Sequence, residues 1–299
     1  MPEYPDIELY RAALLMRLQG TRLASAQLRD AFLLASVEPP LQQLVGRRLE
    51  TVERLGKRIV LGFEGELFMV IHLMISGRLS WTEPPKKPPA ALLSLHFERG
   101  WLGLREAGSK RRARVFLEAG REALQRHDPG GLEVFSATPQ EFSQRLLSRR
   151  HTLKRALTDP RLFSGIGNAY SDEILLRARL SPVRWTTQLG PDEVERLYRC
   201  TLEVLDEWKQ RLLDQWGDGF PTQVTAFHPE MAAHGKFGQP CPQCQQPIQR
   251  IRYADNETNY CCQCQTGGKL LADRSLSRLL KGDWPRTLDE LEQYQRIRK

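Results

Sequence analysis

The sequence lacks several features that would assign it to other classes of protein. No run of residues approaches the roughly 18 apolar residues of a membrane-spanning helix, and the N-terminus lacks the basic-then-apolar pattern of a secretory signal. There is no internal repeat. Of only six cysteines, five lie between positions 241 and 264, a distribution unlike a disulfide framework in so large a chain. We therefore expect a globular protein of the reducing cytoplasm whose clustered cysteines bind metal.

Acidic residues are also in deficit. Lys and Arg number 44 against 36 Asp and Glu, which gives a net charge of +8 and a pI near 9.3. This excess of positive charge favours a polyanionic partner, and nucleic acid is the leading candidate. The competing interpretation is that the charge only maintains solubility. With 299 residues and 40% hydrophobic content, the chain is long enough for two domains with separate cores.

The first part of the chain predicts one helix followed by an antiparallel β region. Apolar residues at helical spacing begin at Ile7 and end before Gly20, so the N-terminus is anchored by a helix. Short apolar runs then predict strands over 49–52, 58–63, 67–73 and 92–97, with Glu64-Gly65 as a hairpin turn. The proline-rich segment 83–89 is expected to be an exposed connection.

After Asp128-Pro-Gly-Gly131 the pattern changes to helical. Helix-forming residues with periodic apolar positions occupy 139–147, 153–163, 169–180 and 192–213, and a loop over 216–229 leads to the cysteines. Beyond the cysteines, 270–280 predicts an amphipathic helix and Thr287-Leu-Asp-Glu290 predicts the capped start of another. We therefore place a domain boundary near residue 128.

The strongest single motif is a pair of Cys-x2-Cys sequences separated by sixteen residues. Four thiolates at this spacing satisfy tetrahedral Zn2+, which predicts one structural zinc held by Cys241, Cys244, Cys261 and Cys264. Cys200 and Cys262 are expected to be uncoordinated thiols. Between the two pairs, basic residues alternate with apolar and aromatic ones over 249–253; this pattern fits either a hairpin that contacts nucleic acid or a solvated edge strand.

A second motif is the glycine-bracketed turn Ser164-Gly-Ile-Gly-Asn168. Backbone N–H groups in such a turn can approach a phosphate closely, and the following helix begins with its positive end exposed. An ordinary connection between two helices gives the same pattern. Asn168 could cap the helix, contact a phosphate oxygen, or do both.

These motifs occur together and in order. Pro2-Glu3, Gly56-Lys57-Arg58, Ile71-His-Leu-Met-Ile-Ser-Gly77, Gly165-Ile-Gly-Asn-Ala-Tyr170 and the cysteine motif resemble the formamidopyrimidine-DNA glycosylase/endonuclease VIII family. The resemblance implies an α+β fold with an N-terminal antiparallel β-sandwich, a helical domain with a helix-two-turn-helix motif and a four-cysteine zinc finger. The corresponding domains are expected at residues 1–127, 128–225 and 226–266, followed by a C-terminal helical extension at 267–299.

The resemblance also implies roles for individual residues. After removal of Met1, Pro2 would be an amine nucleophile, and its α-amino group would titrate near pH 8. Glu3 would be the neighbouring acid/base group. Lys57 would be the third residue of the expected catalytic set and would contact a phosphate or the DNA that flanks the lesion. Asn168 would contact a phosphate. Ile75, or Met74 beside it, would fill the gap left by an everted base, unless these are buried strand residues.

The sequence departs from the family pattern in four places. Asn256 occupies the position of the zinc-finger arginine and lacks its charged fork, so a phosphate contact could move to Arg252, Arg250 or Lys236. The segment 107–112 lacks the phenylalanine of purine-specific members, although Arg111 or Arg112 could still face the orphaned base. The loop 216–227 is shorter than the lesion-covering loop of those members. The extension at 267–299 has no counterpart in minimal members and could add DNA contacts or pack on the body.

The expected function is that of a bifunctional DNA glycosylase and AP lyase of base excision repair, acting as a monomer on damaged or abasic duplex DNA in the cytoplasm, at the nucleoid. The alternative is a protein of the same scaffold that binds damaged DNA without excising bases. A zinc-ribbon regulator is disfavoured, because the motifs begin at the second residue of the chain.

Overall fold

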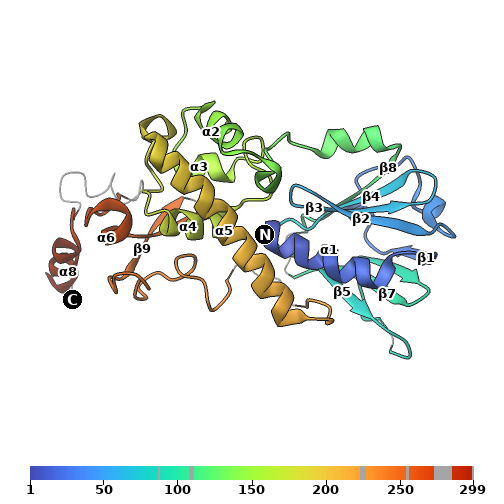
Figure 1. Ribbon diagram of the computed structural model, residues 1–299. Helices are drawn as coiled ribbons and strands as arrows, with labels where there is room; N and C mark the ends of the chain where they lie inside the picture. The colour runs from blue at the N-terminus through green and yellow to red at the C-terminus, as the bar shows by residue number, and fades with distance from the viewer. Residues whose placement is uncertain (87, 108–110, 223–226, 254–255, 273–284, 298–299) are drawn as a thin grey trace. The chain divides into compact units, whose positions relative to one another are not determined.

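The computed structural model spans residues 1–299 and describes all of them except 87, 108–110, 223–226, 254–255, 273–284 and 298–299 (Figure 1). The chain forms two compact units. The first comprises Met1–Gly131 and Asp206–Thr225, and the second comprises Leu132–Leu205 and Ala226–Lys299. The first segment ends close to the boundary expected near residue 128. Residues 206–225 lie in the first unit, and the expected division into domains at 127, 225 and 266 stays a prediction.

The first unit contains two four-stranded antiparallel sheets. One sheet has the order β1-β6-β7-β5 and the other the order β2-β3-β4-β8. Their strands are β1 (Leu23–Leu28), β2 (Leu49–Leu55), β3 (Arg58–Phe63), β4 (Leu67–His72), β5 (Gly77–Thr82), β6 (Leu93–Phe97), β7 (Gly100–Glu106) and β8 (Arg114–Ala119). The expected antiparallel β-sandwich is confirmed.

The core of the first unit lies between the two sheets because their inward-facing residues are apolar. Ile59, Leu61 and Phe63 alternate along β3 and are buried, and Phe63 stacks on Phe97 of β6 with ring centroids 6.4 Å apart. The opposite face of β3 is also covered. There Val60 packs in a smaller cluster with Leu124 of the 3-10 helix η3 (Arg121–His127).

Two helical segments complete this core. Helix α1 (Tyr4–Leu18) buries Ile7, Leu14 and Leu18, the periodic residues that predicted it. The last part of α5 (Pro191–Trp216) contributes Leu212, which is buried with them. Two further 3-10 helices, η1 (Ala31–Leu33) and η2 (Leu41–Leu44), precede β2.

The second unit is mainly helical. Its elements are η4 (Val134–Ser136), α2 (Pro139–Leu147), α3 (Leu153–Thr158), α4 (Asn168–Arg177), η5 (Thr186–Gln188), the first part of α5, β9 (Ile248–Tyr253), β10 (Asn256–Cys261), α6 (Cys262–Thr266) and α8 (Leu288–Ile297). Phe142 of α2 packs against Phe163 and Tyr198, with ring centroids 4.8 and 5.2 Å away. The helix expected over 153–163 ends at Thr158, because Asp159 precedes a proline and leaves the helical region.

The C-terminal extension packs on the second unit where it is described. Leu270 is buried beside Tyr260 and Ile251, and Leu288 and Leu291 pack against this cluster. Helix α8 follows the predicted cap, in which Thr287 Oγ1 accepts the Glu290 N–H at 3.3 Å. Most of the helix expected over 270–280 lies outside the described residues. Among the described helices, none is both long enough and apolar enough to cross a membrane.

Candidate functional site

The N-terminal end of α1 brings two buried carboxyl groups beside the chain terminus. Pro2 is buried, and Glu3 and Asp6 are each only 2% exposed. The Glu3 N–H donates to Asp6 Oδ2 at 2.8 Å, so Asp6 caps the helix that carries Pro2 and Glu3. Burial raises the pKa of Asp6 to about 7, and the charge of Glu3 adds to this rise. Asp6 is therefore a protonatable group at the base of the site.

Burial at this end of the molecule favours a neutral α-amino group. Burial lowers the pKa of the Met1 α-amino group; the negative charges of Glu3 and Asp6 oppose this, whereas the positive charges of Arg78 and Lys57 lower the pKa further. Lys57 lies in the tight turn between β2 and β3, next to Gly56 with φ +60°. A nucleophilic amine needs its lone pair free, and this environment supports that state.

The loop between β4 and β5 presents Ile75 to solvent. Ile75 is 57% exposed, so it is not a buried strand residue. The preceding Met74 has φ +52°, a left-handed conformation that disfavours a side chain, and its N–H donates to His72 Nδ1 at 3.0 Å. Burial and the charges of Arg58 and Lys57 lower the pKa of His72 to about 4, so it is neutral near pH 7 and can accept this bond.

A second loop, between β7 and β8, is tied to the Ile75 loop through Glu106. Glu106 Oε1 accepts the Ser76 hydroxyl at 3.1 Å and the N–H groups of Arg112 and Ala113 at 3.0 and 3.1 Å. Arg111 and Arg112 are both exposed, and Arg111 Nη1 lies 2.6 Å from Asp30 Oδ2. Arg111 and Arg112, one of which is expected to face an orphaned base, thus lie in a loop that Glu106 joins to the loop of Ile75, the residue expected to fill the gap.

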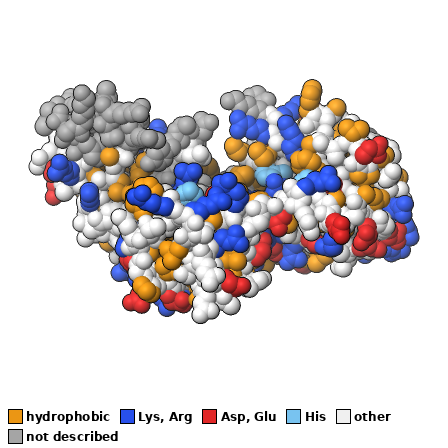
Figure 2. All heavy atoms as spheres, turned by 90° about the horizontal axis from the view of Figure 1, so that it is seen from above, with side chains coloured by type: hydrophobic (Ala, Val, Ile, Leu, Met, Phe, Trp, Pro, Cys, Tyr) orange, Lys and Arg blue, Asp and Glu red, His pale blue; other side chains and the backbone are white. Residues whose placement is uncertain are grey.

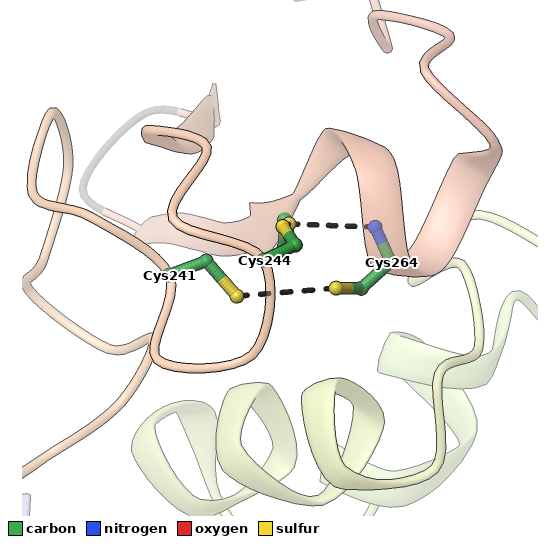
Figure 3. Close-up of side chains that lie close together, drawn as sticks. Cys241, Cys244 and Cys264 are labelled. Atoms are coloured by element: carbon green, nitrogen blue, oxygen red, sulfur yellow. Dashed lines mark hydrogen bonds between the residues drawn. The ribbon is translucent and has the colours of Figure 1, made fainter.

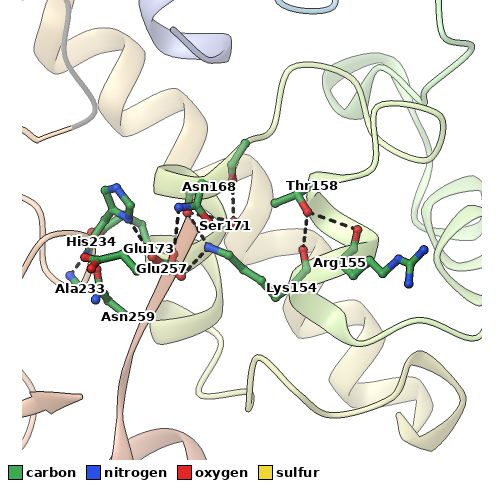
Figure 4. Close-up of polar contacts among 12 residues, drawn as sticks. Lys154, Arg155, Thr158, Asn168, Ser171, Glu173, Ala233, His234, Glu257 and Asn259 are labelled. Atoms are coloured by element: carbon green, nitrogen blue, oxygen red, sulfur yellow. Dashed lines mark hydrogen bonds and ion pairs between the residues drawn. The ribbon is translucent and has the colours of Figure 1, made fainter. Parts of the chain in front are cut away.

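In the second unit, Asn168 is the first residue of α4 and connects it to the cysteine hairpin. Its Nδ2 donates to the Glu257 carbonyl of β10 at 2.8 Å, and its own carbonyl accepts Lys154 Nζ at 2.5 Å (Figure 4). Lys154 also pairs with buried Asp172 at 2.5 Å. Asn168 is therefore held at the glycine-bracketed turn through both its side-chain amide and its backbone carbonyl.

Helix α4 also anchors the segment that leads to the cysteines. The buried Glu173 carboxylate accepts three backbone N–H groups, from Ala232 at 2.9 Å, Ala233 at 2.8 Å and His234 at 2.9 Å. His234 Nδ1 lies 2.8 Å from Asp172 Oδ2 (Figure 4). These contacts fix residues 232–234, shortly before Cys241.

Comparison with known proteins identifies the architecture. The formamidopyrimidine-DNA glycosylase N-terminal domain model matches residues 1–115, and the formamidopyrimidine-DNA glycosylase H2TH domain model matches residues 131–211. Formamidopyrimidine-DNA glycosylases are similar to this chain over most of their length. The enzyme of Chloroflexus aurantiacus is 31% identical, and the match covers 89% of this chain and 98% of the relative. The enzyme of Thermus thermophilus is 34% identical, and the match covers 90% of this chain and 100% of the relative. The chain belongs to the formamidopyrimidine-DNA glycosylase family.

Solved structures agree with this family assignment. The MutM (Fpg) protein of Thermus thermophilus matches with a TM-score of 0.73 and 30% identity, covering 88% of this chain and 98% of that one. The Lactococcus lactis Fpg bound to DNA containing an AP site matches with a TM-score of 0.77 over 88% of this chain and 99% of that one. At 22% identity, this second likeness shows the fold alone.

In this member of the formamidopyrimidine-DNA glycosylase family, the four predicted cysteines come together. The ligand atoms of Cys241, Cys244, Cys261 and Cys264 all lie within 4.8 Å of one another. Cys241 Sγ is 3.9 Å from Cys264 Sγ (Figure 3). Cys244 Sγ is 3.4 Å from Cys261 Sγ. Four sulfurs at about 2.3 Å from a tetrahedral Zn2+ would be about 3.8 Å apart, so these residues fit the ion. Cys262 is buried outside this group, in the cluster with Tyr260.

The tip of the hairpin has no arginine on its second strand. Asn256 begins β10 and is exposed, opposite Tyr253, and Arg252 is exposed opposite Glu257. Of the two alternatives to Arg252, Arg250 stacks on Phe237 at 4.1 Å and Lys236 Nζ donates to the Pro229 carbonyl at 2.6 Å. Both therefore have partners within the protein.

Several residues of this family member's site have no signal in the sequence that predicts their role. Asp6, Glu106 and Glu173 each accept backbone N–H groups that hold a predicted site residue or its segment. Asp6 follows the Pro2-Glu3 motif and Glu173 follows the Gly165–Tyr170 motif, but an acidic residue on a helix predicts no partner. Nothing local to Glu106 predicts that its carboxylate binds two loops.

Proposed function

We propose that this protein is a bifunctional DNA glycosylase and AP lyase of base excision repair that removes oxidised or ring-opened bases from duplex DNA. The observation that carries the proposal is the buried N-terminal end of α1, where Pro2 and Glu3 lie beside Asp6 and burial lowers the pKa of the α-amino group of Met1, the residue before Pro2. Family membership supports it, and the Lactococcus lactis relative was solved with DNA containing an abasic site.

The chemistry begins with removal of Met1, which exposes the secondary amine of Pro2. Its nitrogen lone pair attacks C1′ of the everted nucleotide, and the C1′–N bond electrons leave with the base, which takes up a proton. Glu3 protonates O4′ as the C1′–O4′ bond opens, which leaves a Pro2 iminium. Loss of a C2′ proton then breaks the C3′–O bond and expels the 3′ phosphate by β-elimination. Loss of the C4′ proton drives a second elimination, in which the C5′–O bond breaks and the 5′ phosphate leaves, and water hydrolyses the iminium to regenerate Pro2.

The remaining predicted residues would hold the DNA. Lys57 and Asn168 would contact phosphates near the lesion, and Ile75 would fill the space that the everted base leaves, because it is an exposed apolar side chain on a held loop. Arg111 and Arg112 would face the orphaned base, and Asn256 and Arg252 would contact phosphates from the hairpin. Lys and Arg side chains are abundant on the face seen in Figure 2, as a DNA partner requires.

The four cysteines would hold one structural Zn2+, which supplies no chemistry to the reaction because four thiolates leave no open coordination position. Its contribution would be to fold the hairpin that carries Arg252 and Asn256. We further propose that the protein acts as a monomer in the cytoplasm, where the chromosome of its bacterial relatives lies.

Borohydride trapping tests the proposal. The processed protein is mixed with duplexes that carry an abasic site, 8-oxoguanine, a formamidopyrimidine or an oxidised pyrimidine, and adducts are separated by mass. We expect a covalent adduct that Pro2→Gly strongly reduces, while Glu3→Gln retains DNA binding but loses base release. Intact mass must show that the active fraction lacks Met1. Tight binding without an adduct on any duplex would instead indicate a protein that binds damaged DNA without excising bases.

A further inference from the structure

The 3-10 turn η1 displays a phenylalanine to solvent. Phe32 is 86% exposed, the same fraction as Val37 a few residues later. Single exposed apolar residues are common on protein surfaces and need no function. Phe32 differs from such a residue in how firmly its turn is held and in what surrounds it.

The turn is fixed on both sides of Phe32. Asp30 Oδ1 accepts the Phe32 N–H at 3.0 Å, and Leu33, which follows Phe32, is buried in the core of the first unit. Beyond it, the Ala35 N–H donates to the Val115 carbonyl at 2.8 Å, and Ser36 Oγ accepts the Leu117 N–H at 2.6 Å. The backbone that carries Phe32 therefore has little conformational entropy left to lose on binding.

The same turn is joined to the loops that carry the predicted base-facing residues. Asp30 Oδ2 pairs with Arg111 at 2.6 Å, and this hydrogen bond lowers the pKa of Asp30, so the carboxylate remains charged. Glu106 in turn joins the loop of Arg111 and Arg112 to the loop of Ile75 through Ser76. Phe32 and Ile75 therefore belong to one set of connected loops at the surface of the first unit.

The charge around Phe32 fits a nucleic acid. Arg29, Arg111 and Arg112 are exposed, whereas the acidic side chain within the turn, Asp30, is already paired with Arg111. An exposed aromatic ring among arginines can stack on a base while the cations contact phosphates. The chain also lacks the phenylalanine that the β7–β8 loop of purine-specific relatives is expected to supply, and Phe32 stands beside that loop through the Asp30–Arg111 pair.

We propose that Phe32 is an additional DNA-contacting residue that stacks on a base of the strand opposite the lesion. This inference rests on the proposed function, since the opposite strand is placed by Arg111 and Arg112. Ile75 would fill the lesion-strand gap, and Phe32 would provide an aromatic surface for the orphaned base or its neighbour. The turn η1 would then replace the missing phenylalanine of the β7–β8 loop.

The test uses a duplex with a tetrahydrofuran abasic analogue, which cannot be cleaved, and 2-aminopurine placed opposite it. Binding is measured for wild type, Phe32→Ala, Phe32→Trp and Val37→Ala. Phe32→Ala should weaken binding about tenfold, within the range of base–aromatic stacking, and should abolish the quenching of 2-aminopurine that occurs in the wild-type complex. Phe32→Trp should retain both properties, and the matched control Val37→Ala should resemble wild type.

The outcomes separate this inference from the proposed function. If Phe32→Ala binds within about twofold of wild type and quenches equally, the role of Phe32 is refuted, while borohydride trapping by the wild type would leave the function intact. If the wild type does not prefer the abasic duplex over an undamaged one and traps nothing, both proposals fail. Because Phe32 is exposed, an unchanged melting temperature of Phe32→Ala is expected and excludes misfolding as the cause of weak binding.

Discussion

Replacing Glu173 by Gln is expected to loosen the segment that leads into the cysteine cluster. The carboxylate accepts the N–H groups of Ala232, Ala233 and His234 at 2.8–2.9 Å. Gln has one acceptor oxygen, which can still accept the N–H groups of Ala233 and His234, because both donate to Oε1 of Glu173. Its NH2 group would then face the N–H of Ala232, so that one buried donor loses its partner.

The magnitude follows from these contacts. An unsatisfied buried N–H costs about 1–3 kcal/mol, and the two remaining bonds each weaken by about 1 kcal/mol when the acceptor loses its charge. The loss is partly offset, because burial penalises the carboxylate, as the raised pKa of Glu173 indicates, and Gln avoids this penalty. The net destabilisation of the local structure should be about 2–4 kcal/mol.

Hydrogen exchange measured by mass spectrometry reads this change directly. Amides of residues 232–234 should exchange roughly 30- to 1,000-fold faster in Glu173→Gln, the equivalent of about 2–4 kcal/mol, and a chelator should remove zinc faster. Glu203→Gln, the same chemical change at a half-exposed position of α5, is the matched control and should alter neither quantity. Unchanged protection of 232–234 in Glu173→Gln would refute the anchoring role.

Three further predictions concern the carboxyl groups and the cysteines. Burial raises the pKa of Asp6 from 3.8 to about 7, so the stability that protonated Asp6 gives the fold is fully present below pH 4 and is lost, by about 4 kcal/mol at most, as the pH rises through 7. Urea melts at several pH values should show this loss in the wild type and not in Asp6→Asn. An equal dependence on pH in both proteins would contradict the prediction. Glu106→Ala should destabilise the first unit by about 2 kcal/mol, because it removes the acceptor of two backbone N–H groups. A decrease in the free energy of unfolding in urea below about 0.5 kcal/mol would argue against the role of Glu106 in joining the two loops. Cys244→Ser should lower bound zinc below one ion per chain by elemental analysis and weaken DNA binding, whereas a full complement of zinc would exclude Cys244 as a ligand.

The elements best predicted from the sequence have signals contained within themselves. The bounds of β3 (Arg58–Phe63) and α2 (Pro139–Leu147) agree with the predicted ones, because the first is an uninterrupted apolar run and the second begins with a Thr-Pro capping box. Strands β1, β5, β7 and β8 were not predicted. Of these, β5 and β7 each contain glycine and tryptophan, and β7 has no regular alternation, so pairing with each other and of β7 with β6 determines them.

The residues of the candidate site also divide into those with a local signal in the sequence and those without one. The clustering of the four cysteines could be predicted, because the spacing of two Cys-x2-Cys pairs alone indicates thiols that come together around an ion. The pair Asp30–Arg111 joins residues 81 positions apart, and Glu173 lies 59 positions before Ala232, so no local pattern indicates either contact. Such contacts depend on tertiary folding, and they are the ones that hold the predicted residues in place.

The division of α5 between the two units has a consequence for how the protein is made. Leu212, with Leu213 and Trp216 beside it, completes the core of the first unit, yet the 74 residues 132–205 of the second unit are translated in between. At the usual rate of about 5–20 residues per second, the sheets of the first unit would wait about 4–15 s on the ribosome with part of their apolar surface uncovered. A fragment that stops at Gly131 should therefore aggregate, and one that also includes residues 206–225 should not.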